Sequence, residues 1–111
     1  MKIIVTGGRD YNNANRLNRV LSTLKPTTIV EGGSSGADRL AKDYANSNNI
    51  KLLTNQADWD KHGPSAGPLR NKKMILEHPD AIVLAFPGGK GTANCINQAM
   101  EYGMVVLLVP Q

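Results

Sequence analysis

Residues 87–92, Pro-Gly-Gly-Lys-Gly-Thr, have the composition of a loop that binds an anion. Gly88, Gly89 and Gly91 carry no side chains, so the main chain can close around a phosphate group. A helix is predicted to begin near Thr92, and the positive end of its dipole favours a negative charge there. Two roles stay open for Thr92, as the cap of that helix or as a hydroxyl donor to the same phosphate.

Two more glycine-rich loops follow apolar runs earlier in the chain. Residues 7–10 read Gly-Gly-Arg-Asp, and residues 32–38 read Gly-Gly-Ser-Ser-Gly-Ala-Asp. One such loop often serves only to turn the chain. If the preceding runs are parallel strands, however, all three loops lie at one edge of a sheet, where ligands bind. Their common location indicates a ligand site more strongly than any single loop does.

The glycine spacing does not match the common nucleotide motifs. Lys90 is followed by Gly91 rather than by Ser or Thr, which argues against a Walker A loop. Gly7 and Gly8 lack the third glycine of the dinucleotide fingerprint. The sequence therefore argues against an ordinary nicotinamide-dependent dehydrogenase.

Charged residues accompany these loops. Asp38, in the first turn of a predicted helix, either stabilises the helix dipole or holds ribose hydroxyls. Glu31 ends the preceding strand, and either carboxylate could orient a sugar or a water. Arg70, near a helix start, is the best candidate for a bidentate phosphate contact, followed by Arg9. Glu31, Asp38 and Arg70 are the catalytic candidates.

Trp59 is the only tryptophan of the chain. It lies either over a nucleobase or in the core beneath its loop. Asp58, Asp60 and His62 are close to it in sequence, but their arrangement matches no recognised metal-ligand spacing. We therefore predict neither a metal site nor a separate cofactor.

Five short apolar runs are predicted to form the strands that position these residues. They are rich in β-branched residues or continuous rather than alternating, which is typical of strands buried on both faces. Helical periodicity separates them, and this alternation predicts parallel strands with helices on both faces. The fold class is therefore α/β, with three layers in a single domain over residues 1–111. The runs are residues 3–5, 28–30, 51–53, 81–85 and 105–109.

The periodicity predicts a helix in each gap between the strands. The first must stop before Pro26, and the third is predicted to open with Pro68, which the first helical turn tolerates. The fourth runs over residues 92–102, with Met100 among its inward residues and Gly103 in a left-handed cap. Cys95, on the same apolar stripe, is predicted to be a core residue rather than a nucleophile.

The segment between Leu53 and Gly67 shows no periodicity and is longer than a usual strand-to-helix connection. A long loop in a small domain is typically functional, and ligand specificity is expected from residues 58–65.

The overall composition indicates the cellular compartment and the kind of partner. The single cysteine suits a reducing, cytoplasmic compartment. The formal charge of +4 indicates either a solvated basic surface or an anionic partner. No apolar run approaches the ~20 residues of a membrane span, and the first residues do not resemble a secretory signal. We therefore expect no membrane association.

Four motifs carry a family resemblance: "VTGGRDY", "VEGGSSGAD", "ADWDKHGPSAGPLRNKKM" and "AFPGGKGT". In this order they resemble the YspA-type, cpYpsA-related members of the SLOG superfamily. That superfamily includes the lonely-guy phosphoribohydrolases and the DNA-processing protein A family. The resemblance implies a Rossmann-like fold that binds a nucleotide or nucleotide-derived ligand. It also implies self-association into a homo-oligomer.

This sequence departs from the lonely-guy pattern "PGGxGTxxE" at one position. The pattern's phosphate-binding positions fall on Pro87, Gly88, Gly89, Gly91 and Thr92, whereas its glutamate falls on Cys95. The binding half of the motif is therefore retained, and the carboxylate that assists cleavage of the base–ribose bond is missing.

The leading hypothesis is a sensor or carrier that binds a nucleoside phosphate or an ADP-ribose-like molecule. The first alternative is hydrolysis or transfer of an N-glycosidic bond, and the second, less favoured, is single-stranded DNA binding. The predicted ligand-binding residues are Gly7, Gly8, Arg9, Gly32, Gly33, Ser34, Gly36, Asp38, Trp59, Arg70, Asn71, Pro87, Gly88, Gly89, Gly91 and Thr92.

Overall fold

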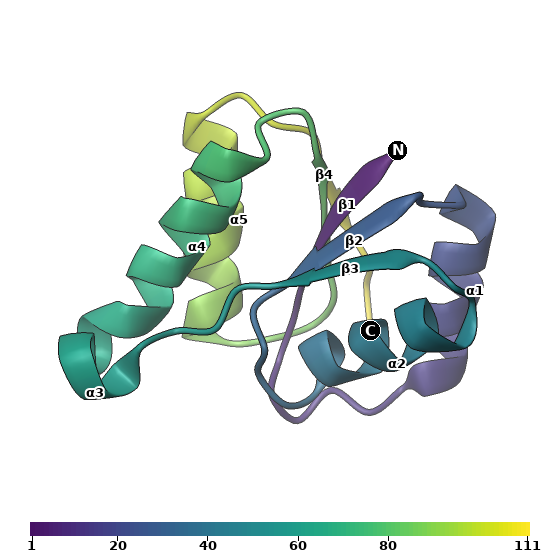
Figure 1. Cartoon of the computed structure of the whole chain (residues 1–111), viewed down its shortest axis with the longest axis horizontal. Helices are drawn as coiled ribbons and strands as arrows, with labels where there is room; N and C mark the ends of the chain where they lie inside the picture. The colour runs from purple at the N-terminus through teal and green to yellow at the C-terminus, as the bar shows by residue number, and fades with distance from the viewer.

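All five predicted strands form, and they make one parallel sheet (Figure 1). The structure is a computed structural model that describes residues 1–111. The strand order is β3-β2-β1-β4-β5, so the chain crosses from one edge of the sheet to the other side of β1 between β3 and β4. The strands are β1 (Lys2–Thr6), β2 (Thr28–Glu31), β3 (Lys51–Thr54), β4 (Ile82–Ala85) and β5 (Val106–Leu108).

Helices cover both faces of the sheet, which gives a Rossmann-like three-layer α/β fold. Figure 1 shows α1 and α2 on one side and α4 and α5 on the other. Each side has its own apolar core, one between the sheet and α1/α2 and the other between the sheet and α4/α5. None of the helices combines the length and apolarity needed to cross a bilayer. The helices are α1 (Ala14–Leu24), α2 (Ala37–Ser47), α3 (Trp59–His62), α4 (Ala66–Glu77) and α5 (Lys90–Glu101), with a 3₁₀ turn at Gly63–Ser65.

The boundaries of α1 illustrate the local signals. The side chain of Asn13 caps the helix by accepting a hydrogen bond from the backbone N–H of Arg16 at 3.1 Å. Leu17 and Leu21, one turn apart, are fully buried. The helix ends in a left-handed residue, Lys25, before Pro26, as predicted.

The predicted burial of the strands holds only in the middle of the sheet. β1, β2 and β4 are almost entirely buried. The edge strands β3 and β5 contain no buried residue, and Leu108 of β5 is 67% exposed. An edge strand has a neighbour on one side only, so the prediction of burial on both faces was wrong for β3 and β5.

The predicted helix boundaries also needed correction. α4 begins at Ala66, two residues before Pro68, and α5 begins at Lys90 rather than Thr92. Met100 is 63% exposed, because it lies about 100° around the helix from the buried Ala99. Gly103 adopts the predicted left-handed conformation, with φ +71°.

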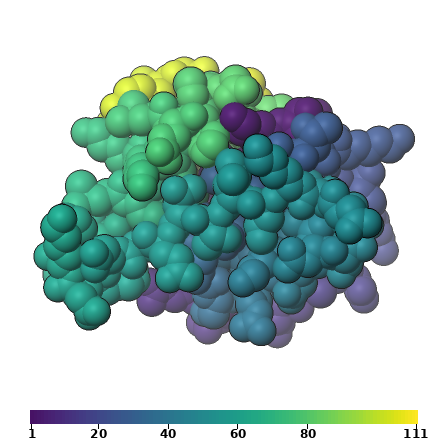
Figure 2. Space-filling view, in the orientation of Figure 1, coloured from purple at the N-terminus to yellow at the C-terminus, as the bar shows by residue number.

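The missing periodicity predicted an irregular loop between β3 and α4, and this prediction was wrong. The segment contains α3, whose first turn is capped by Asp58 through the backbone N–H of Lys61 at 3.1 Å. α3 is only four residues long, too short to show a helical period, and none of its residues is buried. In the space-filling view this segment forms a lobe at the lower left of the molecule (Figure 2).

Candidate functional site

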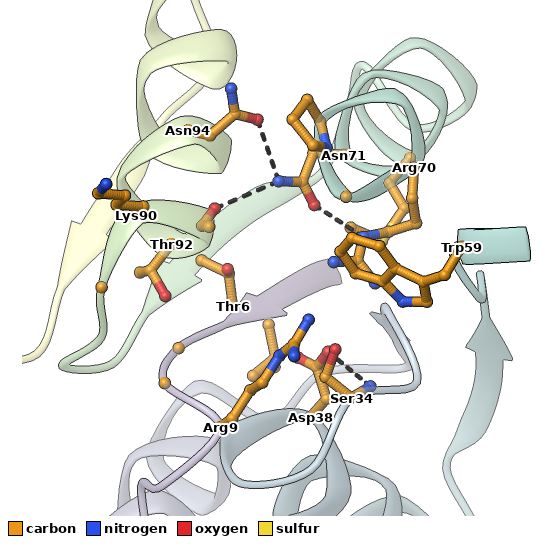
Figure 3. A pocket seen from close by; sticks show the side chains of 18 of the residues that line it. Thr6, Arg9, Ser34, Asp38, Trp59, Arg70, Asn71, Lys90, Thr92 and Asn94 are labelled. Carbon is orange, nitrogen blue, oxygen red and sulfur yellow. Dashed lines mark hydrogen bonds between the residues drawn. The ribbon is translucent and has the colours of Figure 1, made fainter. Parts of the chain in front are cut away.

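A cavity of about 430 Å³ opens where β1 ends and α2, α4 and α5 begin. We call it the central cavity (Figure 3). It lies at the carboxyl ends of the strands, beside the point between β1 and β4 where strand order reverses, which is where open α/β sheets bind ligands. Its lining residues are Val5, Thr6, Gly7, Gly8, Arg9, Ser34, Asp38, Trp59, Pro64, Gly67, Pro68, Arg70, Asn71, Met74, Gly89, Lys90, Gly91, Thr92 and Asn94.

The amino-terminal turn of α5 forms one wall of this cavity. Gly89 is its N-cap, so no side chain caps the helix and Thr92 does not serve as the cap. The backbone N–H groups of Lys90, Gly91 and Thr92 make no hydrogen bond within the protein, and the side chain of Thr92 makes none either. This turn therefore offers unpaired donors and the positive end of a helix dipole to the cavity.

The glycines of this loop differ in what surrounds them. A Cβ on Gly88 would lie 2.7 Å from the backbone nitrogen of Gly8 and would clash with the Thr92 hydroxyl. Gly88 therefore allows the loops after β1 and β4 to pack, an arrangement that the Gly8 N–H fixes by donating to the Pro87 carbonyl at 2.9 Å. A Cβ on Gly89 or Gly91 would meet nothing within 4 Å, which leaves space beside the unpaired N–H groups.

The loop after β2 is held against the loop after β1. Gly36 has φ +73°, and a Cβ there would overlap the carbonyls of Gly8 and Arg9. The Ala37 N–H donates to the Gly8 carbonyl at 3.1 Å, and the Ser35 hydroxyl donates to the Arg9 carbonyl at 3.1 Å. Gly36 lines none of the main cavities, so its role in the structure is to bring the two loops together.

Asp38 is a nearly buried carboxyl group on the cavity wall. Its side chain accepts the backbone N–H of Ser34 at 3.2 Å and is 6% exposed. Burial raises the pKa of Asp38 to about 6; the Glu31 charge adds to the increase, while the Ser34 N–H and Arg70 oppose it. Near neutral pH this carboxyl can therefore exchange a proton with a bound molecule.

Glu31 lies outside the central cavity and is 1% exposed. Its Oε1 accepts the Gly33 N–H at 2.7 Å, and its Oε2 accepts the Thr54 hydroxyl. Both oxygens are thus used to connect the ends of β2 and β3. Of the two predicted carboxylates, the structure places only Asp38 on the cavity.

Arg70 and Asn71 link three elements beside the cavity. Arg70 donates from Nη1 to the Gly32 carbonyl at 2.6 Å and from Nε to Asn71 Oδ1 at 2.8 Å. Asn71 Nδ2 donates in turn to the Gly91 carbonyl at 3.2 Å and to Asn94 Oδ1 at 3.1 Å (Figure 3). Nη2 of Arg70 makes no hydrogen bond within the protein and Nη1 makes only one, so part of the guanidinium stays available for the predicted phosphate contact.

Arg9 and Trp59 stand together at the mouth of the cavity. The Arg9 guanidinium carbon lies 5.3 Å from the Trp59 ring centroid, and Figure 3 shows the guanidinium pointing towards the indole. Arg9 forms no ion pair with a carboxylate. Trp59 is 45% exposed and does not fill the core, which removes one of its two predicted roles.

The remaining predicted residues fall around this centre. Gly32 and Gly33 line a neighbouring cavity that also contains Ser34, Arg9 and Arg70. Pro87 and Gly88 do not line the central cavity and instead line two more open hollows, the larger of about 620 Å³. Cys95 is fully buried, and burial raises the pKa of its thiol to about 11, as suits the predicted core residue.

Sequence reasoning missed several lining residues. Lys90 stands inside the glycine loop and could have been included on its position alone. Thr6 ends β1, and Asn94 lies one turn into α5, where its role depends on the facing Asn71 of α4. No local sequence pattern identifies such a pair, because its members are 23 residues apart.

Comparison with known proteins agrees with this architecture. A profile described as "YspA, cpYpsA-related SLOG family" matches residues 1–62, which is more than half of the 111-residue chain. The chain belongs to this SLOG family. It is also 32% identical over 121 residues to the Gene 61 protein of Mycobacterium phage D29, covering 96% of this chain and 94% of that protein.

Among solved structures, this SLOG chain is similar to DNA processing protein A (DprA) from Streptococcus pneumoniae. The TM-score is 0.78 at 21% sequence identity, and the match covers 99% of this chain. It covers 50% of the DprA chain, so the SLOG chain spans half the length of that protein. At this identity the likeness shows a common fold.

Proposed function

We propose that the central cavity binds a nucleotide or nucleotide-derived ligand, with a phosphate group at the amino-terminal turn of α5. Membership of the SLOG family and the DprA-like fold support a role connected with nucleotides or DNA. The observation that carries the proposal is the set of unpaired N–H groups on Lys90, Gly91 and Thr92, beside glycines with open space. A phosphate oxygen is the acceptor that such a helix terminus favours.

The rest of the cavity suits the remainder of a nucleotide. Asp38 provides carboxylate oxygens for ribose hydroxyls, in the way that acidic residues do in other nucleotide sites. The exposed indole of Trp59 offers a flat apolar surface for a base. Arg9 adds a positive charge that no protein carboxylate neutralises. We propose that this combination defines a sensor or carrier of the ligand.

The proposal is tested by a thermal-shift screen against nucleoside mono-, di- and triphosphates, ADP-ribose, nicotinamide dinucleotides and cyclic dinucleotides. A ligand present at about 100 times its Kd stabilises the fold by about 2.7 kcal/mol. We expect a clear rise in Tm with at least one ligand. If no ligand in the screen changes Tm, phosphate binding at α5 is wrong.

The Gly91→Ala variant tests whether the ligand that raises Tm binds at the amino-terminal turn of α5. In the absence of ligand the alanine has free space and a better helix propensity, so we expect a gain of about 0.5–1 kcal/mol in unfolding free energy. Its methyl group would stand beside the unpaired N–H groups, so we expect at least a tenfold loss of ligand affinity. Asn97→Ala, an exposed position of the same helix outside the cavity, is the control and should retain affinity.

A second candidate function is hydrolysis or transfer of an N-glycosidic bond. The observation in its favour is Asp38, whose carboxyl borders the cavity with a pKa of about 6, suited to general acid–base work. Chromatography of each stabilising ligand after incubation separates the functions. Intact ligand supports a sensor or carrier. Free base and sugar phosphate, lost in Asp38→Asn while binding persists, would support the enzyme.

A further inference from the structure

A second cavity, of about 290 Å³, adjoins the central cavity on the side of the loop after β2. We call it the Gln56 cavity. The two cavities adjoin, because both are lined by Arg9, Ser34, Trp59 and Arg70. The residues that line the Gln56 cavity are Arg9, Gly32, Gly33, Ser34, Ser35, Gln56, Ala57, Trp59 and Arg70.

The charge of the Gln56 cavity is one-sided. Its lining contains two arginines and no aspartate or glutamate. Arg9 has no carboxylate partner, and Arg70 keeps its Nη2 group unpaired. Two carboxylates are hydrogen-bonded to the loop after β2: Glu31 is buried and uses both oxygens on Gly33 and Thr54, and Asp38 is buried and accepts the Ser34 N–H. An anion in this cavity would therefore meet guanidinium groups and no lining carboxylate.

Neutral donors supplement the two arginines. The backbone N–H of Ser35, which lines this cavity, makes no hydrogen bond within the protein. The hydroxyl of Ser34 and the amide of Gln56 also have no partner. Gln56 packs over Gly33, where a Cβ would lie 2.9 Å from Gln56 Cγ, so its amide group stays close to this loop.

Together with the α5 turn, the edge of the sheet thus has two groups of anion donors, and Arg9 and Trp59 line both of the cavities in which they lie. We propose that the site binds a nucleoside that carries a phosphate group on each side. One phosphate lies at α5, the nucleoside lies in the central cavity, and the second phosphate lies in the Gln56 cavity. This inference rests on the proposed function and specifies its ligand class. A nucleoside 3′,5′-bisphosphate and a phosphodiester-linked dinucleotide both have this chemistry.

The experiment compares affinities by isothermal titration calorimetry and by the fluorescence of Trp59, the only tryptophan. The probes are the 5′-monophosphates and the 3′,5′-bisphosphates of the four common ribonucleosides, and the 5′-phosphorylated dinucleotides of the same bases. We expect the best bisphosphate or dinucleotide to bind at least tenfold more tightly than its monophosphate. A preference for the dinucleotide over the bisphosphate identifies the phosphodiester as the source of the second phosphate.

Gln56→Glu tests the location of the second phosphate. The exposed Gln56 lines only the Gln56 cavity, and its replacement adds a negative charge there with little change of shape. We expect the variant to lose the tenfold advantage and to bind the monophosphate as the wild type does. Asn18→Asp, an exposed position of α1 that lines no main cavity, adds the same charge elsewhere and should keep the advantage.

The failures are distinguishable. If none of these probes binds and the thermal-shift screen also finds no ligand, the proposed function itself is wrong. If none of these probes binds but the screen finds another nucleotide ligand, only the ligand class inferred here is wrong. If a monophosphate binds and the second phosphate adds nothing, only the Gln56 cavity proposal is wrong. The same conclusion follows if the tenfold advantage persists in Gln56→Glu.

Discussion

Asp38 couples the stability of the fold to pH. The pKa of Asp38 is about 6 in the folded protein, against a model-compound value of 3.8. The folded state therefore holds a proton that the unfolded state releases. The stability from this proton is complete below about pH 4 and is lost as pH rises through 6. The shift corresponds to a loss of about 3 kcal/mol by pH 8. We expect Asp38→Asn, which keeps an oxygen for the Ser34 N–H, to exceed the wild type in stability at pH 8.

Urea denaturation of both proteins between pH 4 and 8 measures this effect. The difference in unfolding free energy should grow with pH and level off above pH 7. A difference that does not change with pH would mean that the Asp38 pKa is not raised. Ionised Asp38 lowers the stability of the fold, and residues that lower stability in this way are typically kept because they serve a function.

At the level of elements, Asn71 joins α4 to α5 beside the phosphate site. It is 3% exposed, and its loss would leave the Nε of Arg70 without a partner and would remove its hydrogen bonds to the Gly91 carbonyl and to Asn94 Oδ1. Unsatisfied buried groups cost about 1–3 kcal/mol each. We expect Asn71→Ala to lower the unfolding free energy by about 2–4 kcal/mol and to weaken ligand binding, because Gly91 belongs to the α5 turn.

The matched control is Lys72→Ala, which changes the next, exposed residue of α4. It should remain within about 0.5 kcal/mol of the wild type. Equal stability of the two variants in urea would show that the Asn71 hydrogen bonds do not hold α4 and α5 together.

At the level of the whole molecule, the net charge of +4 raises the question of whether the protein binds a nucleic acid. Only Lys2 forms an ion pair, with Asp80 at 3.4 Å, and most of the lysines and arginines are exposed. Scattered charges give weak, sequence-independent attraction to phosphates that salt screens. We expect a labelled dT12 oligonucleotide to bind at low salt and to lose at least tenfold in affinity between 50 and 200 mM salt, as followed by fluorescence anisotropy.

An Arg9→Gln variant sharpens this test. Because Arg9 is one of many exposed charges, its loss should hardly change dT12 binding, while it weakens nucleotide binding in the cavity. Binding of dT12 that survives 200 mM salt and disappears in Arg9→Gln would instead favour the single-stranded DNA hypothesis.

The sequence by itself determined the five strands, the four longer helices and the edge at which they present their loops. The β-branched runs predicted the parallel strands, and the helix boundaries were predicted to within about two residues, because periodicity, glycine and proline act through neighbours in the chain. The glycine loops were therefore placed at the correct edge of the sheet. Membership of the SLOG family, indicated by the four motifs, was confirmed by the family profile.

Only the tertiary structure decided how the polar side chains are used. Glu31 and Asp38 flank the same glycine loop, yet Glu31 bonds to Thr54 of β3 while Asp38 faces the central cavity. Arg70 donates to Gly32, 38 residues away, and Gln56 lies over Gly33. The partners of a hydrogen-bonding group depend on which atoms are close in space. Contacts between residues distant in the chain leave no local pattern from which they could be predicted.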